Sequence, residues 1–170
     1  MKNFTRKILA TFIFHAVASH FINGLLPVAV LFMLLTVITA DPYYDHTVIH
    51  LFYIASLAVP LAFFSGIHDW RKRFHHNRAP IFYRKIKLSI LLALLCAAVV
   101  SIRLLWPDPL AAGGAIAWLY GGCIFLTLPV VVLLGHLGGK LAFMVRQRST
   151  EGANPSRKSV KRSLPKDQHG

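Results

Sequence analysis

Residues 86–106, IKLSILLALLCAAVVSIRLLW, decide the fold class of this chain. As one helix, this apolar run is long enough to cross about 30 Å of hydrocarbon, which takes about 20 residues. It does not alternate apolar and polar residues, as a strand of a membrane β-barrel would. Because only helices and closed barrels satisfy their backbone groups in lipid, the run predicts a transmembrane helix.

Three further runs of this kind lie at about 8–40, 48–67 and 111–145. Hydrophobic residues make up 55% of the 170-residue chain, more than an ordinary soluble domain of this size contains. The sequence therefore predicts an all-α bundle of four transmembrane helices within residues 1–148. Residues 149–170 are polar and rich in Ser and basic residues, so we expect them to form a disordered basic tail.

The first run, at about 8–40, could also be a secretory signal that is cleaved after Ala40. A cleaved signal has an apolar region of about 7–15 residues, and this run is about twice as long and contains polar residues. We therefore expect a retained helix. Asn23 and Pro27 predict an irregularity within it, and a short interfacial helix that ends before Asn23 is the alternative.

The formal net charge of +13 is unevenly distributed along the chain. Basic residues precede the first run, fill the 68–85 connection and follow the last run, whereas the connections 41–46 and 107–110 contain only acidic charges. By the positive-inside rule, both termini are predicted to be cytoplasmic, in a multi-pass protein of the bacterial inner membrane. The charge indicates anionic lipid headgroups rather than nucleic acid as the partner.

The polar residues inside the apolar runs are mainly histidines, and ionisable residues within a membrane often mark function. His15 and His20 lie on the first run, and His136 lies on the last run at nearly the same depth as His15. Two histidines from neighbouring helices are a common way to hold haem b, so these residues are candidate haem ligands. The alternatives are a metal or proton relay, or a structural role in which the imidazoles hydrogen-bond to backbone, Ser or Asn.

A second pair of histidines lies one helical turn apart at the other end of the bundle. His46 and His50 are candidate ligands of a metal ion such as copper or zinc, because imidazole suits both. In the same region, Arg103 is expected to form an ion pair with Asp108 or with the 41–45 connection.

The stretch SGIHDWR at residues 65–71 is the most distinctive local motif. Its glycine permits close contact between helices, and its tryptophan is expected at the membrane interface. We interpret the stretch as a structural hinge, with a cytoplasmic-face site for a headgroup, quinone or partner as the alternative. The residues assigned a structural or partner-binding role are Asn23, Gly66, His68, Asp69 and Trp70.

Catalytic motifs such as GxSxG, HExxH, phosphate loops and dinucleotide fingerprints are absent from the sequence, so we name no catalytic residue. All six acidic residues are placed in connections, tails or helix ends, which argues against a proton-driven transporter. Three hypotheses follow: an accessory or assembly subunit of a membrane complex, a redox subunit with haem b, or a metal-ion carrier that uses His46 and His50. Gly135 and Gly139 are interpreted as packing residues, with a homodimer contact as the alternative.

Three short motifs resemble a bacterial family of four-helix membrane proteins that is classed as a domain of unknown function. HAVASHF at residues 15–21 is similar to its HPxxVHF motif, with Ala16 in place of proline. Its GxxDW motif matches residues 66–70, and its GGxL motif matches residues 138–141. The resemblance implies a four-helix architecture over most of residues 10–145, and it implies no activity.

Overall fold

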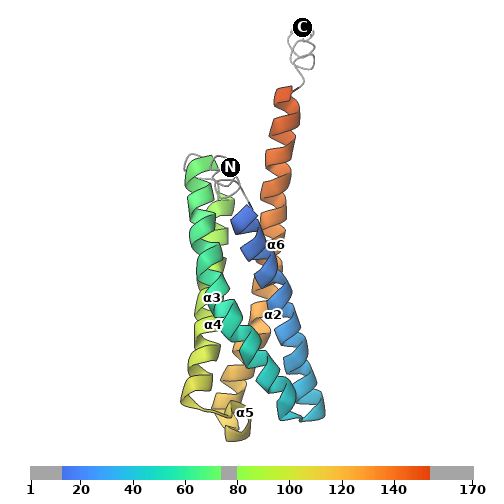
Figure 1. The fold of residues 1–170 in the computed structure, drawn as a ribbon, viewed down its shortest axis with the longest axis vertical. Helices are drawn as coiled ribbons and strands as arrows, with labels where there is room; N and C mark the ends of the chain where they lie inside the picture. The colour runs from blue at the N-terminus through green and yellow to red at the C-terminus, as the bar shows by residue number, and fades with distance from the viewer. Residues whose placement is uncertain (1–12, 74–79, 154–170) are drawn as a thin grey trace, which may run out of the picture. The chain divides into compact units, whose positions relative to one another are not determined.

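A computed structural model describes residues 13–73 and 80–153 and contains four long helices and one short one (Figure 1). They are α2 (Ile13–Thr39), α3 (Pro42–Arg73), α4 (Pro80–Leu105), α5 (Pro109–Ala112) and α6 (Gly114–Ala153). Each long helix holds a segment long and apolar enough to span a membrane: Val17–Thr39, Pro42–His68, Pro80–Leu105 and Gly114–Leu141. The predicted all-α, four-helix fold is confirmed, and the chain is a multi-pass membrane protein.

Two of the helices begin earlier than the apolar runs predict. α3 begins at Pro42 rather than at residue 48, and α4 begins at Pro80 rather than at residue 86. At the start of α3, proline suits the first helical position, because its missing N–H needs no partner there and its φ is already helical. Hydropathy marks only the part of a helix that crosses lipid, so the polar first turns fall outside the predicted runs.

The last predicted run, 111–145, differs from helix α6 at both ends. It starts inside the short helix α5, and α6 begins only at Gly114, after Gly113 with φ 67°. α6 then continues to Ala153, into the predicted tail, because extending an existing helix is far easier than nucleating one. Residues 154–170 of that tail lie outside the described residues.

The prolines within the spans do not interrupt the helices. α2, α3 and α6 continue through Pro27, Pro60 and Pro129. The alternative of a short interfacial helix that ends before Asn23 is therefore wrong. Transmembrane helices tolerate proline where neighbouring groups or local adjustments satisfy the freed backbone carbonyl.

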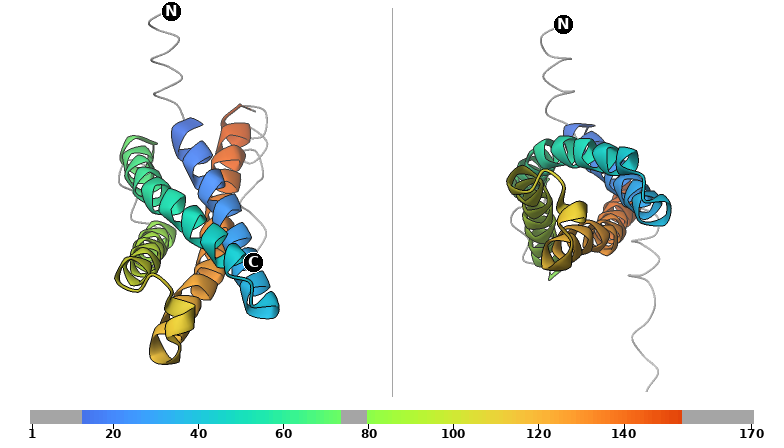
Figure 2. Two further views of the ribbon diagram at one scale, coloured as in Figure 1. Left: turned by 60° about the horizontal axis from the view of Figure 1, so that its bottom comes forward. Right: turned by 90° about the horizontal axis from the view of Figure 1, so that it is seen from below.

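The chain divides into two units, one up to Gly135 and the other from His136 onward. In the first unit, Figure 2 shows α3 between α2 and α4, and the first part of α6 completes the group. Its core is filled by apolar side chains from all four long helices, among them Leu26, Met33, Val48, Phe52, Val99 and Ile124. Other large apolar side chains point outward, as expected for helices that contact lipid.

Two short connections lie at one end of the first unit, which we call the short-loop end: Ala40–Asp41 between α2 and α3, and residues 106–108 between α4 and α5. Ala40 has φ 55°, and its N–H donates to the Thr36 carbonyl at 2.9 Å, which closes α2. The Asp41 carboxylate accepts from the Tyr43 N–H at 2.9 Å and starts α3.

Gly113→Ala is expected to lower the free energy of unfolding by about 1–3 kcal/mol. Gly113 has φ 67° and ψ −166°, a backbone conformation that is essentially restricted to glycine. Thermal unfolding in detergent, followed by circular dichroism, measures the loss. Gly122→Ala is the matched control, since Gly122 lies within α6 with open space around its Cα and should tolerate a methyl group. Equal stability of the two variants would contradict the prediction.

Candidate functional sites

His15 of α2 is hydrogen-bonded to helix α3. Its Nδ1 lies 3.0 Å from the Ala62 carbonyl oxygen and 3.1 Å from the Ser65 hydroxyl oxygen. A carbonyl only accepts, so Nδ1 carries the proton and donates to Ala62. The Ser65 hydroxyl donates to the same carbonyl at 3.0 Å. The half-buried imidazole therefore links α2 to α3 just before the segment Val17–Thr39 that can span the membrane.

Gly66 provides the space that this imidazole occupies. A Cβ atom at position 66 would lie 2.9 Å from Cε1 of His15, 3.4 Å from its Nδ1 and 3.5 Å from its Nε2. A contact of 2.9 Å is shorter than real Cβ contacts allow, so any other residue would force His15 to move. Gly66 and His15 thus form one contact between α2 and α3.

The three candidate haem ligands, His15, His20 and His136, lie in different surroundings. The edge of the His15 ring faces α3 at Gly66, whereas His20 is exposed on the surface of the first unit. His136 is the first residue of the second unit. Coordination of haem by His136 with His15 or His20 therefore stays a prediction.

A buried polar cluster joins three helices at the short-loop end. The Asp45 carboxylate of α3 pairs with Nη1 of Arg103 of α4 at 2.6 Å, and it accepts the Tyr120 hydroxyl of α6 at 3.0 Å. Asp45 is 4% exposed and Tyr120 is fully buried. The expected ion pair of Arg103 is confirmed, with Asp45 rather than Asp41 or Asp108 as its partner.

The sequence reasoning missed Tyr120 and placed Asp45 in a connection. The sequence does indicate that Asp45 belongs to a helix. Asp41 followed by Pro42 is typical of a helix N-terminus, with Asp as the cap and Pro at the first position. A helix that starts there places Asp45 in its first turn, from which the side chain reaches the bundle interior.

His46 and His50 lie on the outer surface of α3, and both are exposed. Their ring centroids are 4.6 Å apart, and the Nδ1–H of His50 donates to the His46 carbonyl at 2.7 Å. Within the described part of the chain, no group of three or more His, Cys, Asp or Glu side chains is arranged to hold a metal ion. The pair therefore offers two protein ligands at most.

The residues with a predicted structural or partner-binding role are spread over two helices. Asn23 is half-buried on α2, and its Nδ2 would lie 3.7 Å from a Cβ at Gly135, an ordinary van der Waals distance. His68 is exposed near the end of α3. Asp69 and Trp70 belong to α3, and their side chains lie outside the described part of the structure.

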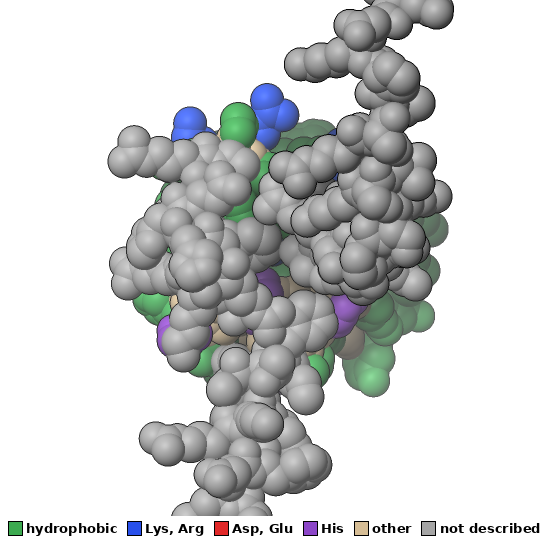
Figure 3. Space-filling model, turned by 90° about the horizontal axis from the view of Figure 1, so that it is seen from above, with side chains coloured by type: hydrophobic (Ala, Val, Ile, Leu, Met, Phe, Trp, Pro, Cys, Tyr) green, Lys and Arg blue, Asp and Glu red, His purple; other side chains and the backbone are tan. Residues whose placement is uncertain are grey.

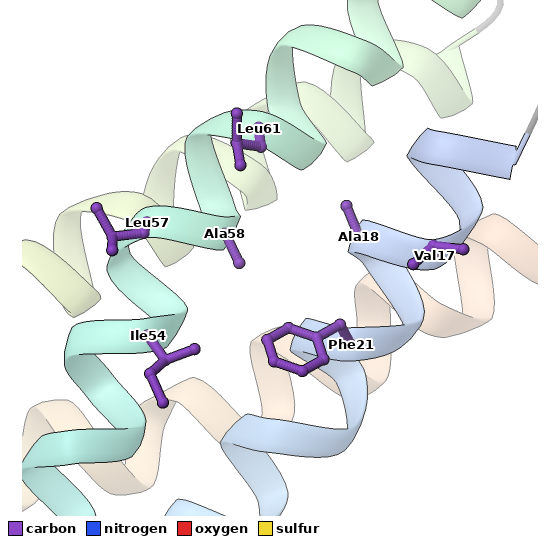
Figure 4. Close-up of a pocket in the computed structure, with 7 residues that line it drawn as sticks. All are labelled: Val17, Ala18, Phe21, Ile54, Leu57, Ala58 and Leu61. Carbon is purple, nitrogen blue, oxygen red and sulfur yellow. The ribbon is translucent and has the colours of Figure 1, made fainter. Parts of the chain in front are cut away.

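An apolar groove runs between α2 and α3 on the outer surface of the first unit (Figure 4). Its volume is about 330 Å³, and it is lined by Val17, Ala18, Phe21, Ile54, Leu57, Ala58 and Leu61. All seven side chains end in carbon, so the groove can hold hydrocarbon but offers no group for acid–base or metal chemistry. Inside a membrane, lipid chains border such a surface.

Comparisons of the chain with protein-family models, curated proteins and solved structures find no match. The resemblance to the bacterial four-helix family therefore stays a prediction. The geometry of the described residues is the ground for a functional proposal.

Proposed function

We propose that this protein is a small accessory or assembly subunit of a larger complex in the bacterial inner membrane. The observation that supports this proposal is that the main polar side chains in and next to the spans are bonded to neighbouring helices. His15 binds backbone and hydroxyl groups of α3, and Asp45, Arg103 and Tyr120 bind one another. Groups engaged in this way hold helices together rather than line a path for an ion or a substrate.

The outer surface supports the same proposal. Large apolar side chains face outward from every long helix, and Trp118 of α6 is the most exposed of them at 83%. Leu57 of α3 follows at 74%. Surfaces of this kind suit lipid and the transmembrane helices of another protein, because association in membranes depends on close packing rather than on water exclusion.

The charge distribution supports an orientation with both termini in the cytoplasm. Arg84 and Lys87 are exposed near the start of α4, at the end opposite the short-loop end. Figure 3 looks onto that end and shows Lys and Arg side chains there. Asp41 and Asp108 are exposed at the short-loop end. Anionic headgroups of the inner leaflet are the proposed partners of the basic end.

Site-specific photo-crosslinking in cells tests the proposal. A photoreactive residue at Trp118 or Leu57 is expected to capture the same membrane protein in repeated experiments, whereas the same residue at the fully buried Phe52 should capture none. Deleting the chain should then lower the amount of the complex that contains the captured protein. Adducts with lipid alone, together with migration as a free chain in native gels, would refute an accessory role.

The rival hypothesis, a redox subunit with haem b, makes a separate prediction for the same purified protein. A chain with haem held by His136 and by His15 or His20 should show a Soret band and a reduced-minus-oxidised α band. Protein purified from haem-replete cells without these bands excludes haem b and leaves the accessory role as it stands.

A further inference from the structure

His46 and His50 are arranged as two neighbouring ligands on one helix face. They are separated by four residues, so their side chains project from the same side of α3, one turn apart. Both rings are exposed, which leaves their outer edges accessible from outside the bundle. His46 lies in the first two turns of α3, close to the short-loop end.

One hydrogen bond prepares His50 for metal binding. Its Nδ1–H donates to the His46 carbonyl at 2.7 Å, so the proton of the neutral ring is on Nδ1 and Nε2 carries the lone pair. Histidines that bind metals usually donate their other ring N–H to a carbonyl or carboxylate in this manner, which fixes the tautomer and orients the ring. Here the carbonyl belongs to the other member of the pair.

The spacing of the two rings suits a shared ion. An imidazole nitrogen binds zinc at about 2.0–2.1 Å, which places the ring centre about 3.2 Å from the ion. Two rings bound at about a right angle would then have centres about 4.5 Å apart. The observed centroid separation is 4.6 Å, in a T-shaped contact with an interplanar angle of 64°, so the distance between the rings is compatible with two ligands of one ion.

The adjacent carboxylate is not available as a third ligand. Asp45 precedes His46, but both of its oxygens are engaged, one by Arg103 and the other by Tyr120. His46 and His50 lie in the first part of the segment Pro42–His68 that can span the membrane, so the remaining coordination positions would be filled by ligands from outside the chain, such as water close to the short-loop end. Imidazole ligands with water suit Cu²⁺, Ni²⁺ and Zn²⁺ rather than Ca²⁺ or Mg²⁺, which prefer oxygen ligands.

We propose that His46 and His50 form a two-imidazole binding site for a divalent transition-metal ion, and that this site binds Cu²⁺ more tightly than Ni²⁺ or Zn²⁺. The order follows from the general affinity series for nitrogen ligands. The site is separate from the contacts that join the helices, and it does not depend on the proposed accessory role.

Titration of the purified, untagged full-length chain in detergent with Cu²⁺ tests this proposal. One ion per chain is expected, with an electron paramagnetic resonance spectrum that shows coupling to imidazole nitrogens. His46→Ala and His50→Ala should each weaken Cu²⁺ binding by at least about tenfold, because loss of even an outer-shell partner costs about 10–100-fold. Because both residues are exposed, the helical content and the unfolding temperature should not change.

His20→Ala and His68→Ala are the matched controls, since each removes an exposed histidine elsewhere on the surface. They are expected to leave Cu²⁺ affinity unchanged. The proposal is overturned if the His46→Ala/His50→Ala double variant binds Cu²⁺ as tightly as the natural chain. It is also overturned if the control variants lose as much affinity as the single variants of the pair.

Discussion

Arg103→Ala is expected to lower the free energy of unfolding by about 3–5 kcal/mol, because it leaves a buried charge without its partner. Asp45 is 4% exposed, and Arg103 is its only cationic partner among the described residues. After the substitution, the Tyr120 hydroxyl alone would face the carboxylate. Unfolding in mixed micelles with increasing SDS, followed by circular dichroism, measures the change.

Asp45→Asn is expected to lower the free energy of unfolding by less than Arg103→Ala does. The Arg103 side chain is 16% exposed and long enough to bring its charge to the interface, so Asp45→Asn leaves a cation that water can reach. Replacing Asp45 and Arg103 with leucine together with Tyr120→Phe should restore much of the stability, since well-packed apolar residues often replace a buried ion pair at little cost and Tyr120→Phe removes the hydroxyl that would lose its acceptor. Arg84→Ala, at an exposed position, is the control. If Arg103→Ala lowers the free energy of unfolding by less than about 1 kcal/mol, the prediction is contradicted, because that is the contribution of an ordinary surface ion pair.

Gly66→Ala is expected to lower the free energy of unfolding by about 1–3 kcal/mol, the usual cost of overpacking. The added methyl group would lie 2.9 Å from Cε1 of His15. His15 can yield only by giving up its hydrogen bonds to Ala62 and Ser65, because these bonds hold Nδ1 in place. Unfolding in mixed micelles measures this loss as well.

The double variant His15→Ala/Gly66→Ala distinguishes this clash from a general effect on α3. Removing the imidazole removes the atoms that the methyl group would meet, so the double variant should be about as stable as His15→Ala alone. Gly24→Ala is the matched control, since nothing lies within 4 Å of a Cβ at that position. If the losses of the two single variants simply add in the double variant, His15 and Gly66 do not interact as described.

The number and type of helices follow from the sequence because they depend on local properties. A run such as residues 86–106 is too long and too apolar for anything but a membrane helix, and no distant residue changes that conclusion. Arg103 near the end of that run needs a counter-charge, and the nearby acidic connections offered one. Depth along a helix is equally predictable, at about 1.5 Å per residue.

Rotation of each helix about its axis was decided only by the tertiary structure. The spans are apolar on nearly all sides, so periodicity does not show which face of α2 or α6 meets a neighbour. Depth alone did not show that the imidazole of His15 lies against Gly66 of α3. For the same reason Tyr120 was not recognised: only the assembled first unit brings its hydroxyl to the Asp45 carboxylate.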